Sequence, residues 1–251
     1  MEKLEADIVI VGTGASGLFA ALHVPSDKKV IMLTKSDAEN SDSFLAQGGI
    51  CVLRDKNDFD SFMEDTMKAG HYENRKESVE IMINSSRDTI NELIGYGVDF
   101  ATKDGELDYT REGAHSKPRI LFHEDITGKE ITSTLLGAVR KLENVTIMEY
   151  VTMTDIIEKD NVCYGVLAKD ANNNEMCIEA GYTIFACGGI GGLYDHSTNY
   201  PHLTGDAIAI AIQHGIKLEN VDYVQIHPTT LYTKKKGRAF LISESVRGEG
   251  A

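Results

Sequence analysis

One stretch near the N-terminus constrains the fold more than any other. It reads ADIVIVGTGASGLFAALHV, from Ala6 to Val24, and leads from an apolar run into three spaced glycines, Gly12, Gly14 and Gly17. The apolar run predicts a buried strand, and the residues after the glycines have helical spacing up to Pro25. A strand, a glycine turn and a helix in this order open a βαβ unit of a parallel sheet.

Each glycine in this turn has its own physical reason. Gly12 permits the tight turn, Gly14 lets the backbone approach a pyrophosphate, and Gly17 lets the helix lie close to the strand. The free N–H groups and the dipole of the helix N-terminus then stabilise the phosphates. We therefore predict a dinucleotide site at Gly12, Thr13, Gly14, Ala15, Ser16 and Gly17.

The second strand, Val30 to Lys35, ends differently from that of an ordinary NAD-binding protein. An acidic residue at its end would accept a hydrogen bond from the ribose 2′-OH, but this chain has Thr34 and Lys35 there. The lysine disfavours NAD and suggests a ligand with a 2′-phosphate instead.

The rest of the chain alternates between helical and strand-like patterns. Short strand-like runs between Val145 and Ala186 are separated by Asp-Asn and Asn-Asn-Asn turns, which predicts an antiparallel meander. Thr127 and Glu130 have the spacing of a helix capping box. Helices are expected over residues 59–69, 78–94 and 205–215 and from residue 127 onward. The predicted fold class is therefore α/β.

Composition excludes several kinds of partner. The 251 residues carry a formal charge of −14, which disfavours nucleic acid and anionic membranes. No apolar segment approaches the length of a membrane span, and no signal peptide is apparent. The four cysteines form no CxxC pair, so we expect reduced thiols, no metal site and a cytoplasmic location.

Three further motifs indicate a family. NSDSFLAQGGI begins at Asn40, FACGGIGG at Phe185 and TGDAIAIA at Thr204. Together with the first βαβ unit, they resemble the flavoprotein family of fumarate reductase, succinate dehydrogenase and L-aspartate oxidase along essentially all 251 residues. The resemblance implies a Rossmann-like FAD-binding domain, with a parallel sheet and an antiparallel meander, over residues 1–220. It places the beginning of an α+β capping domain at residues 221–251.

The same resemblance adds cofactor contacts to those of the glycine turn. It implies that the AQGG loop lines the FAD, that a glycine turn with Cys187 in place of threonine passes near it, and that the TGD aspartate faces it. The resemblance also covers Lys35, because aspartate oxidases have a lysine at this position where other flavoproteins have a glutamate. The implied contacts are Lys35, Asp42, Ser43, Phe44, Leu45, Ala46, Gln47, Gly48, Gly49, Gly188 and Asp206. Because Asp42 stands where the respiratory relatives have a histidine that bonds FAD covalently, we expect non-covalent FAD.

The loop TREGAHSKPRIL, Thr110 to Leu121, resembles the aspartate oxidase version of this segment. An ammonium group distinguishes aspartate from succinate, and the resemblance implies that Glu112 binds it through a charge-assisted hydrogen bond. The alternative is that Glu112 pairs with Arg111 or Arg119 at the surface. We expect His115 to be structural.

The final motifs are QIHPTTLY and ISESVRGEGA. The resemblance implies that His227 donates to a substrate carboxylate, that Gln225 lies near the reactive edge of the flavin, and that Ser243 contacts the dicarboxylate. It also implies a proton relay through Glu244 and Arg247, whose spacing places them on one helix face.

The implied activity is oxidation of L-aspartate to iminoaspartate with FAD as electron acceptor, followed by electron transfer to dioxygen or fumarate. Its product would feed quinolinate and NAD synthesis, with quinolinate synthase downstream. One alternative is a soluble fumarate reductase. Another is a non-catalytic dinucleotide-binding module in which Lys35 serves a 2′-phosphate and no flavin binds.

The resemblance also carries an expectation about extent. In the family, the cap continues past the RGEG motif and supplies a catalytic arginine, and the chain then returns to the FAD domain. We therefore expect the 251 residues alone to bind FAD weakly and not to turn over L-aspartate.

Overall fold

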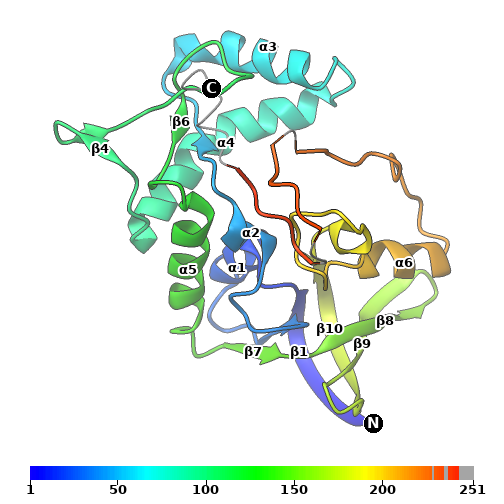
Figure 1. Ribbon diagram of the computed structural model, residues 1–251. Helices are drawn as coiled ribbons and strands as arrows, with labels where there is room; N and C mark the ends of the chain where they lie inside the picture. The colour runs from blue at the N-terminus through cyan, green and yellow to red at the C-terminus, as the bar shows by residue number, and fades with distance from the viewer. Residues whose placement is uncertain (228, 235–236, 243–251) are drawn as a thin grey trace. The chain divides into compact units, whose positions relative to one another are not determined.

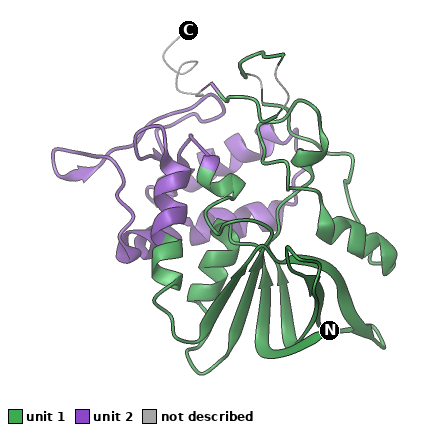
Figure 2. Ribbon diagram, turned by 60° about the horizontal axis from the view of Figure 1, so that its bottom comes forward, with its two compact units in different colours: residues 1–44, 135–241 green, residues 45–134, 242–251 purple. Residues whose placement is uncertain are grey.

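The computed structural model describes residues 1–227, 229–234 and 237–242. The chain forms two compact units, shown in Figure 2. Unit 1 contains residues 1–44 and 135–241, and unit 2 contains residues 45–134 and 242–251. The predicted division near residue 220 into an FAD-binding domain and a cap came from the family resemblance and not from compactness. It stays a prediction.

Unit 1 is built on a six-stranded mixed sheet (Figure 1) with the strand order β7-β2-β1-β10-β9-β8. The neighbours β7, β2, β1 and β10 are parallel, whereas β10, β9 and β8 are antiparallel. The strands are β1 (Glu2–Val11), β2 (Val30–Thr34), β7 (Val145–Glu149), β8 (Thr152–Lys159), β9 (Val162–Lys169) and β10 (Glu175–Phe185). The helices are α1 (Ala15–Leu22), α2 (Asp42–Leu45), the short 3-10 helix η2 (Gly191–Leu193) and α6 (Asp206–Gln213).

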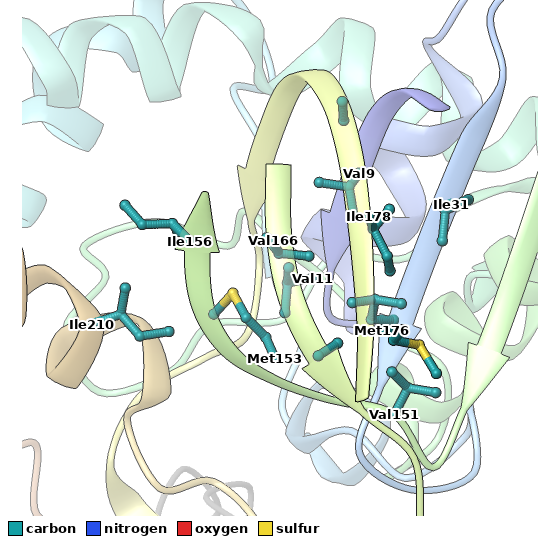
Figure 3. Packing of buried hydrophobic residues seen from close by; sticks show 13 residues of the cluster. Val9, Val11, Ile31, Val151, Met153, Ile156, Val166, Met176, Ile178 and Ile210 are labelled. Carbon is teal, nitrogen blue, oxygen red and sulfur yellow. The ribbon is translucent and has the colours of Figure 1, made fainter. Parts of the chain in front are cut away.

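The core of this sheet collects alternate residues of neighbouring strands. Val9 and Val11 of β1 lie in one buried cluster with Ile178 of β10, because side chains two apart share a face of a strand (Figure 3). Ile210 attaches α6 to the same cluster. Each fully buried side chain of this size contributes about 1.5–3 kcal/mol through the hydrophobic effect.

The predicted meander is wrong at its first strand. β7 pairs in parallel with β2, from Val30 opposite Val145 to Thr34 opposite Glu149. The last part of this region, Glu175–Phe185, forms the single strand β10, which pairs antiparallel with β9 and parallel with β1. Only β8, β9 and β10 form the antiparallel part. Local turn signals showed where strands end, but not which strand each one joins.

Unit 2 is mainly helical. α3 (Phe59–Ala69) packs on α4 (Lys76–Tyr96) through a buried cluster that includes Phe62, Met63 and Ile83. Before α3 lies the 3-10 turn η1 (Lys56–Asp58). The other strands are the antiparallel pairs β3 (Ile50–Cys51) with β6 (Ile120–Leu121) and β4 (Thr102–Lys103) with β5 (Glu106–Leu107). The β3–β6 pair joins the end of the AQGG segment to the end of the TREGAHS loop.

The predicted capping box of α5 (Thr127–Val139) does not form. The Thr127 hydroxyl accepts a hydrogen bond from His123 N at 3.0 Å, and the Glu130 carboxylate accepts one from Asp99 N at 3.0 Å. Both side chains therefore stabilise neighbouring loops instead of the helix N-terminus. Among the described residues, no helix combines the length and apolar character needed to cross a bilayer.

Candidate functional site

The glycine turn after β1 has the geometry that its sequence predicts. Gly12 has φ +115°, and a Cβ there would overlap the carbonyl oxygen of Ala186, just after β10. A Cβ on Gly17 would overlap the carbonyl oxygen of Gly12, so α1 lies against the turn without space for a side chain. A Cβ on Gly14 would instead meet Ser43 Oγ at 3.1 Å.

The N-terminus of α1 offers donors to an anion. The N-cap residue is Gly14, which has no side chain to accept a hydrogen bond from the helix N-terminus. The first turn carries no acidic residue. The first N–H groups of a helix have no partner within it. Ala15 N donates to Ser43 Oγ at 3.1 Å, while Ser16 lies in the same turn and lines the adjacent pocket. This arrangement favours a phosphate over any neutral ligand.

This pocket lies within unit 1 where β1, β2 and β10 end, and it is lined there by Val11, by Leu33 and Thr34, and by Ala186 just after β10. Ligands of open α/β sheets bind beyond the carboxyl ends of the strands, which is where this pocket lies. The lining includes these predicted cofactor residues: Gly12, Thr13, Gly14, Ser16, Lys35, Asp42, Ser43, Gly188 and Asp206. The glycine turn, the uncapped helix and the polar walls fit the pyrophosphate and ribose of a dinucleotide.

Lys35 uses its three ammonium donors inside this pocket wall. Its Nζ lies 2.9 Å from His202 O, 2.7 Å from Thr204 Oγ1 and 2.7 Å from Asp206 Oδ2. Thr204 Oγ1 donates in turn to Asp206 Oδ1 at 2.7 Å. Because these bonds engage the ammonium group, the geometry favours a lysine that ties β2 to the start of α6. It disfavours the alternative in which Lys35 binds a 2′-phosphate.

Asp42 is also held within unit 1. Its carboxylate accepts hydrogen bonds from Asn199 Nδ2 and from Tyr200 N, the latter at 3.0 Å. The sequence did not single out Asn199, His202 or Thr204. The TGD motif itself, Thr204 to Asp206, is the signal that points to Thr204.

Gly188 continues the pocket after β10 with φ +72°, a backbone conformation that favours glycine. The neighbouring Cys187 lines the same pocket. Burial raises the pKa of its thiol, and the Asp206 charge adds to this, while N–H groups and Lys35 oppose it. The thiol is therefore neutral at pH 7, and Cys187 lines the pocket with a small uncharged side chain.

The AQGG loop belongs to unit 2, and its glycines differ. A Cβ on Gly49 would overlap Ile120 Cγ2 and Leu121 O, so this glycine permits the close β3–β6 pairing. A Cβ on Gly48 would meet only the carboxylate oxygens of Glu112, at 3.8 and 3.9 Å. Gln47 Oε1 is buried with no hydrogen-bond partner among the described residues. Of the remaining predicted contacts, Phe44 and Leu45 lie in α2, and the carbonyl of Ala46 accepts from Gly128 N at 2.9 Å.

The structure thus brings Glu112 to the AQGG loop. The Glu112 charge also raises the pKa of Cys51, although burial is the larger cause and Arg119 opposes both, and the result is about 11. The Cys51 thiol is therefore neutral, and the Glu112 carboxylate is the anionic group beside Gly48.

Arg119 is not a surface partner for Glu112. It is fully buried, and its guanidinium binds Asp58 through Nε at 3.1 Å and Nη2 at 2.8 Å, and Asp65 through Nη1 at 2.5 Å. This buried cluster was not foreseen, because its members lie 54 and 61 residues apart in the sequence. The surface pairing of Glu112 with Arg119 that we considered above is therefore disfavoured.

His115, which we expected to be structural, contacts two side chains of unit 2. Arg119 Nη1 donates to His115 Nδ1 at 3.2 Å, so the proton of the neutral ring is on Nε2, which lies 3.3 Å from Cys51 Sγ. Burial lowers the pKa of His115, the Arg119 charge lowers it further, and the charges of Asp65 and Asp58 oppose this. The ring therefore stays neutral at pH 7 and links the loop to β3.

The C-terminal candidates are only partly described. Gln225 and His227 line one pocket of unit 1 together with Asn199, and His227 Nδ1 lies 3.2 Å from Thr229 N. Their predicted substrate contacts stay predictions. Ser243, Glu244 and Arg247 lie outside the described residues.

Comparison with known proteins places these features in a family. A family model described as an FAD binding domain matches residues 7–251. The chain is 45% identical over 249 residues to the L-aspartate oxidase of Clostridium perfringens and 46% identical over 250 residues to that of Clostridium acetobutylicum. Both alignments cover 99% of this chain but 56% and 57% of the relatives. The chain therefore spans about half the length of the curated relatives it matches.

Comparison with solved structures supports the same family. The E. coli quinol fumarate reductase FrdA matches with a TM-score of 0.92 at 27% identity, over 100% of this chain and 43% of that one. Mycobacterium smegmatis Sdh1 in complex with UQ1 matches with a TM-score of 0.88 at 29% identity, over 99% and 44% of the two chains. These matches confirm the family resemblance that the motifs indicated. The chain belongs to the FAD-binding domain family, and FAD is its cofactor.

Proposed function

We propose that this chain carries the FAD-binding and substrate-recognition residues of an L-aspartate oxidase. The observation that carries the proposal is the Glu112 carboxylate beside Gly48 of the AQGG loop, the loop that the family resemblance aligns with the flavin. The Clostridium relatives named L-aspartate oxidase support the same assignment.

Within this proposal, each group has a physical task. The first turn of α1 binds the pyrophosphate, and the pocket residues at the ends of β1 and β2 hold the nucleotide. FAD, when bound, accepts the two electrons released from the substrate α-carbon. Glu112 orients L-aspartate by accepting hydrogen bonds from its ammonium group, a group that succinate and fumarate lack. His227 and Gln225 are proposed to bind the dicarboxylate, with Ser243, Glu244 and Arg247 completing the contacts and the proton relay.

The proposal also covers how FAD is held, which molecule accepts the electrons, and where the domains divide. We propose that FAD is bound without a covalent bond, because Asp42 occupies the place of the histidine and is held by Asn199 and Tyr200. Dioxygen or fumarate would take the electrons, and quinolinate synthase in the cytoplasm would consume the iminoaspartate. The boundary between the FAD domain (1–220) and the cap (221–251) belongs to the same proposal.

The test uses the full natural polypeptide, purified and examined by absorbance under anaerobic conditions. L-aspartate should bleach the flavin band and succinate should not, and acid should release FAD intact into the supernatant. Bleaching by succinate alone would support the second candidate, a soluble fumarate reductase, which the structural match to the E. coli enzyme favours. A protein that takes up no FAD would support the non-catalytic module.

Glu112→Gln sharpens this test. The substitution keeps the size and removes the charge, so L-aspartate oxidation should fall roughly 10- to 100-fold, as expected for the loss of ~1.5–3 kcal/mol from a hydrogen bond to a charged group. Fumarate reduction should change much less, because fumarate has no ammonium group. Equal losses on both substrates would contradict the assigned role.

A further inference from the structure

The loop that carries Glu112 leaves and returns at a single point in unit 2. Thr110 N donates to Ile120 O at 2.9 Å, and Ile120 N and Arg119 N donate to Thr110 O at 3.1 and 3.2 Å. Residues 111–119 therefore form a closed loop, which we call the Glu112 loop. Glu112 lies two residues beyond Thr110 on one side of this base, so the base fixes the start of the loop, and contacts farther along the loop must hold the turn that follows Glu112.

One carboxylate oxygen of α3 holds the far part of this loop. Asp65 Oδ2 accepts hydrogen bonds from Ser116 N and Ser116 Oγ, both at 2.7 Å, and from Arg119 Nη1 at 2.5 Å. The Asp65 side chain is only 15% exposed. Hydrogen bonds to a charged, poorly solvated acceptor are the stronger ones.

These contacts continue to Glu112 through the backbone. His115, which precedes Ser116, donates its N–H to Glu112 O at 3.0 Å. The His115 ring is fixed between Arg119 Nη1 and Cys51 Sγ. The turn that presents Glu112 is thus connected to Asp65 on one side and to β3 on the other.

We propose that Asp65 is a positioning residue for substrate recognition. It touches neither substrate nor cofactor in this proposal, and it acts through Ser116 and Arg119 to hold Glu112 where an ammonium group binds. The inference rests on the proposed function. Recognition of this kind requires the carboxylate to stay within about 0.5 Å of its productive position, so loosening the loop should weaken binding of the amino acid selectively.

The kinetic test compares three variants of the full natural polypeptide. In Asp65→Asn, the KM for L-aspartate should rise about 10-fold while kcat changes less than about twofold, because binding energy rather than chemistry is lost. Ser116→Ala removes one of the three bonds and should raise this KM by about threefold. Asp60→Asn is the matched control, because Asp60 is an exposed aspartate of the same helix, and it should leave KM unchanged. Fumarate reduction should stay within about twofold of wild type in all three.

A second readout does not depend on activity. Hydrogen exchange of peptides covering residues 111–119 should be faster in Asp65→Asn than in Asp60→Asn, since Ser116 N loses its charged acceptor. Faster exchange with a selective rise in the KM for L-aspartate supports the proposal. Unchanged exchange, or equal losses on L-aspartate and fumarate, would overturn it. If the wild-type protein itself does not oxidise L-aspartate, the proposed function fails instead, and the exchange experiment still decides whether Asp65 holds the loop.

Discussion

Two basic residues drew attention in the sequence for different reasons: Lys35 of unit 1 as a possible partner of a 2′-phosphate, and Arg119 of unit 2 as a possible surface partner of Glu112. Both bind other groups, which are carboxylates of the protein. The Lys35 and Asp206 side chains are 23% and 21% exposed, whereas Arg119 is 0% exposed and Asp58 is 4% exposed. The two ion pairs therefore share chemistry but differ in solvation.

The anions of the two clusters also differ in what else stabilises them. Asp206 is the first residue of α6, where the helix dipole favours a negative charge, and Thr204 Oγ1 donates to it at 2.7 Å. In the Arg119 cluster, Asp58 is the N-cap of α3 and also contacts Ser61 and Lys117. Asp65, by contrast, lies in the middle of α3 and depends on Arg119 and Ser116. The comparison shows that the loss of stability on removing a cation depends on which other groups still stabilise the carboxylate it paired with.

The largest effect should come from Arg119→Ala. The substitution removes the buried partner of two carboxylates, leaving Asp58 with Ser61 and Lys117 and Asp65 with Ser116, and loss of one partner of a buried ion pair costs about 3–5 kcal/mol. We expect the free energy of unfolding, measured in urea with the 251-residue chain, to fall by this amount.

Arg87→Ala is the control for this measurement, because Arg87 is exposed on α4 of the same unit. Its effect should stay within about 0.5 kcal/mol. A cost of Arg119→Ala no larger than that of Arg87→Ala would show that burial of the cluster contributes nothing.

The same contrast explains which features the sequence could predict. Gly12, Gly14 and Gly17 form a local sequence pattern between an apolar strand and a helix, so their spacing was sufficient to predict the turn and its helix. The parallel pairing of β7 with β2 and the Arg119 cluster join segments far apart in the sequence, where local patterns carry no pairing information. Of the candidate site, the glycine turn was foreseen, whereas the proximity of Glu112 to Gly48 of the AQGG loop is a finding of the structure. The Lys35–Asp206 pair and Asp65 were not foreseen either, because each depends on a tertiary contact.

Acid should weaken unit 2 through Asp58. Burial raises the pKa of its carboxyl, but hydrogen bonds from Arg119, Ser61 and Lys117, with the Arg119 charge, outweigh this and lower the pKa from 3.8 to about 2. A carboxyl whose pKa is lower in the folded state stabilises the fold above its unfolded pKa, by on the order of 2 kcal/mol here. This contribution should be complete above about pH 5 and lost as the pH falls through 3.8 toward 2.

The measurement is urea unfolding of wild type and Asp58→Asn between pH 7 and pH 2. The difference in free energy of unfolding between the two proteins should shrink as the pH falls through this window, because wild-type Asp58 becomes protonated and then, like asparagine, carries no charge. A difference that stays constant down to pH 2 would contradict the assigned charge interaction.

The smallest effect should come from Lys35→Met. Methionine keeps most of the apolar stem of lysine, and Asp206 retains Thr204 and the N-terminus of α6, so the loss of stability should be only about 1 kcal/mol. Salt should separate the two clusters further. The Debye length falls from about 10 Å at 0.1 M to about 3 Å at 1 M, and partly exposed pairs are screened more than buried ones. The difference between wild type and Lys35→Met should therefore decrease as sodium chloride is raised, whereas that between wild type and Arg119→Ala should remain. Equal salt dependence of the two differences would show that solvation does not distinguish the clusters.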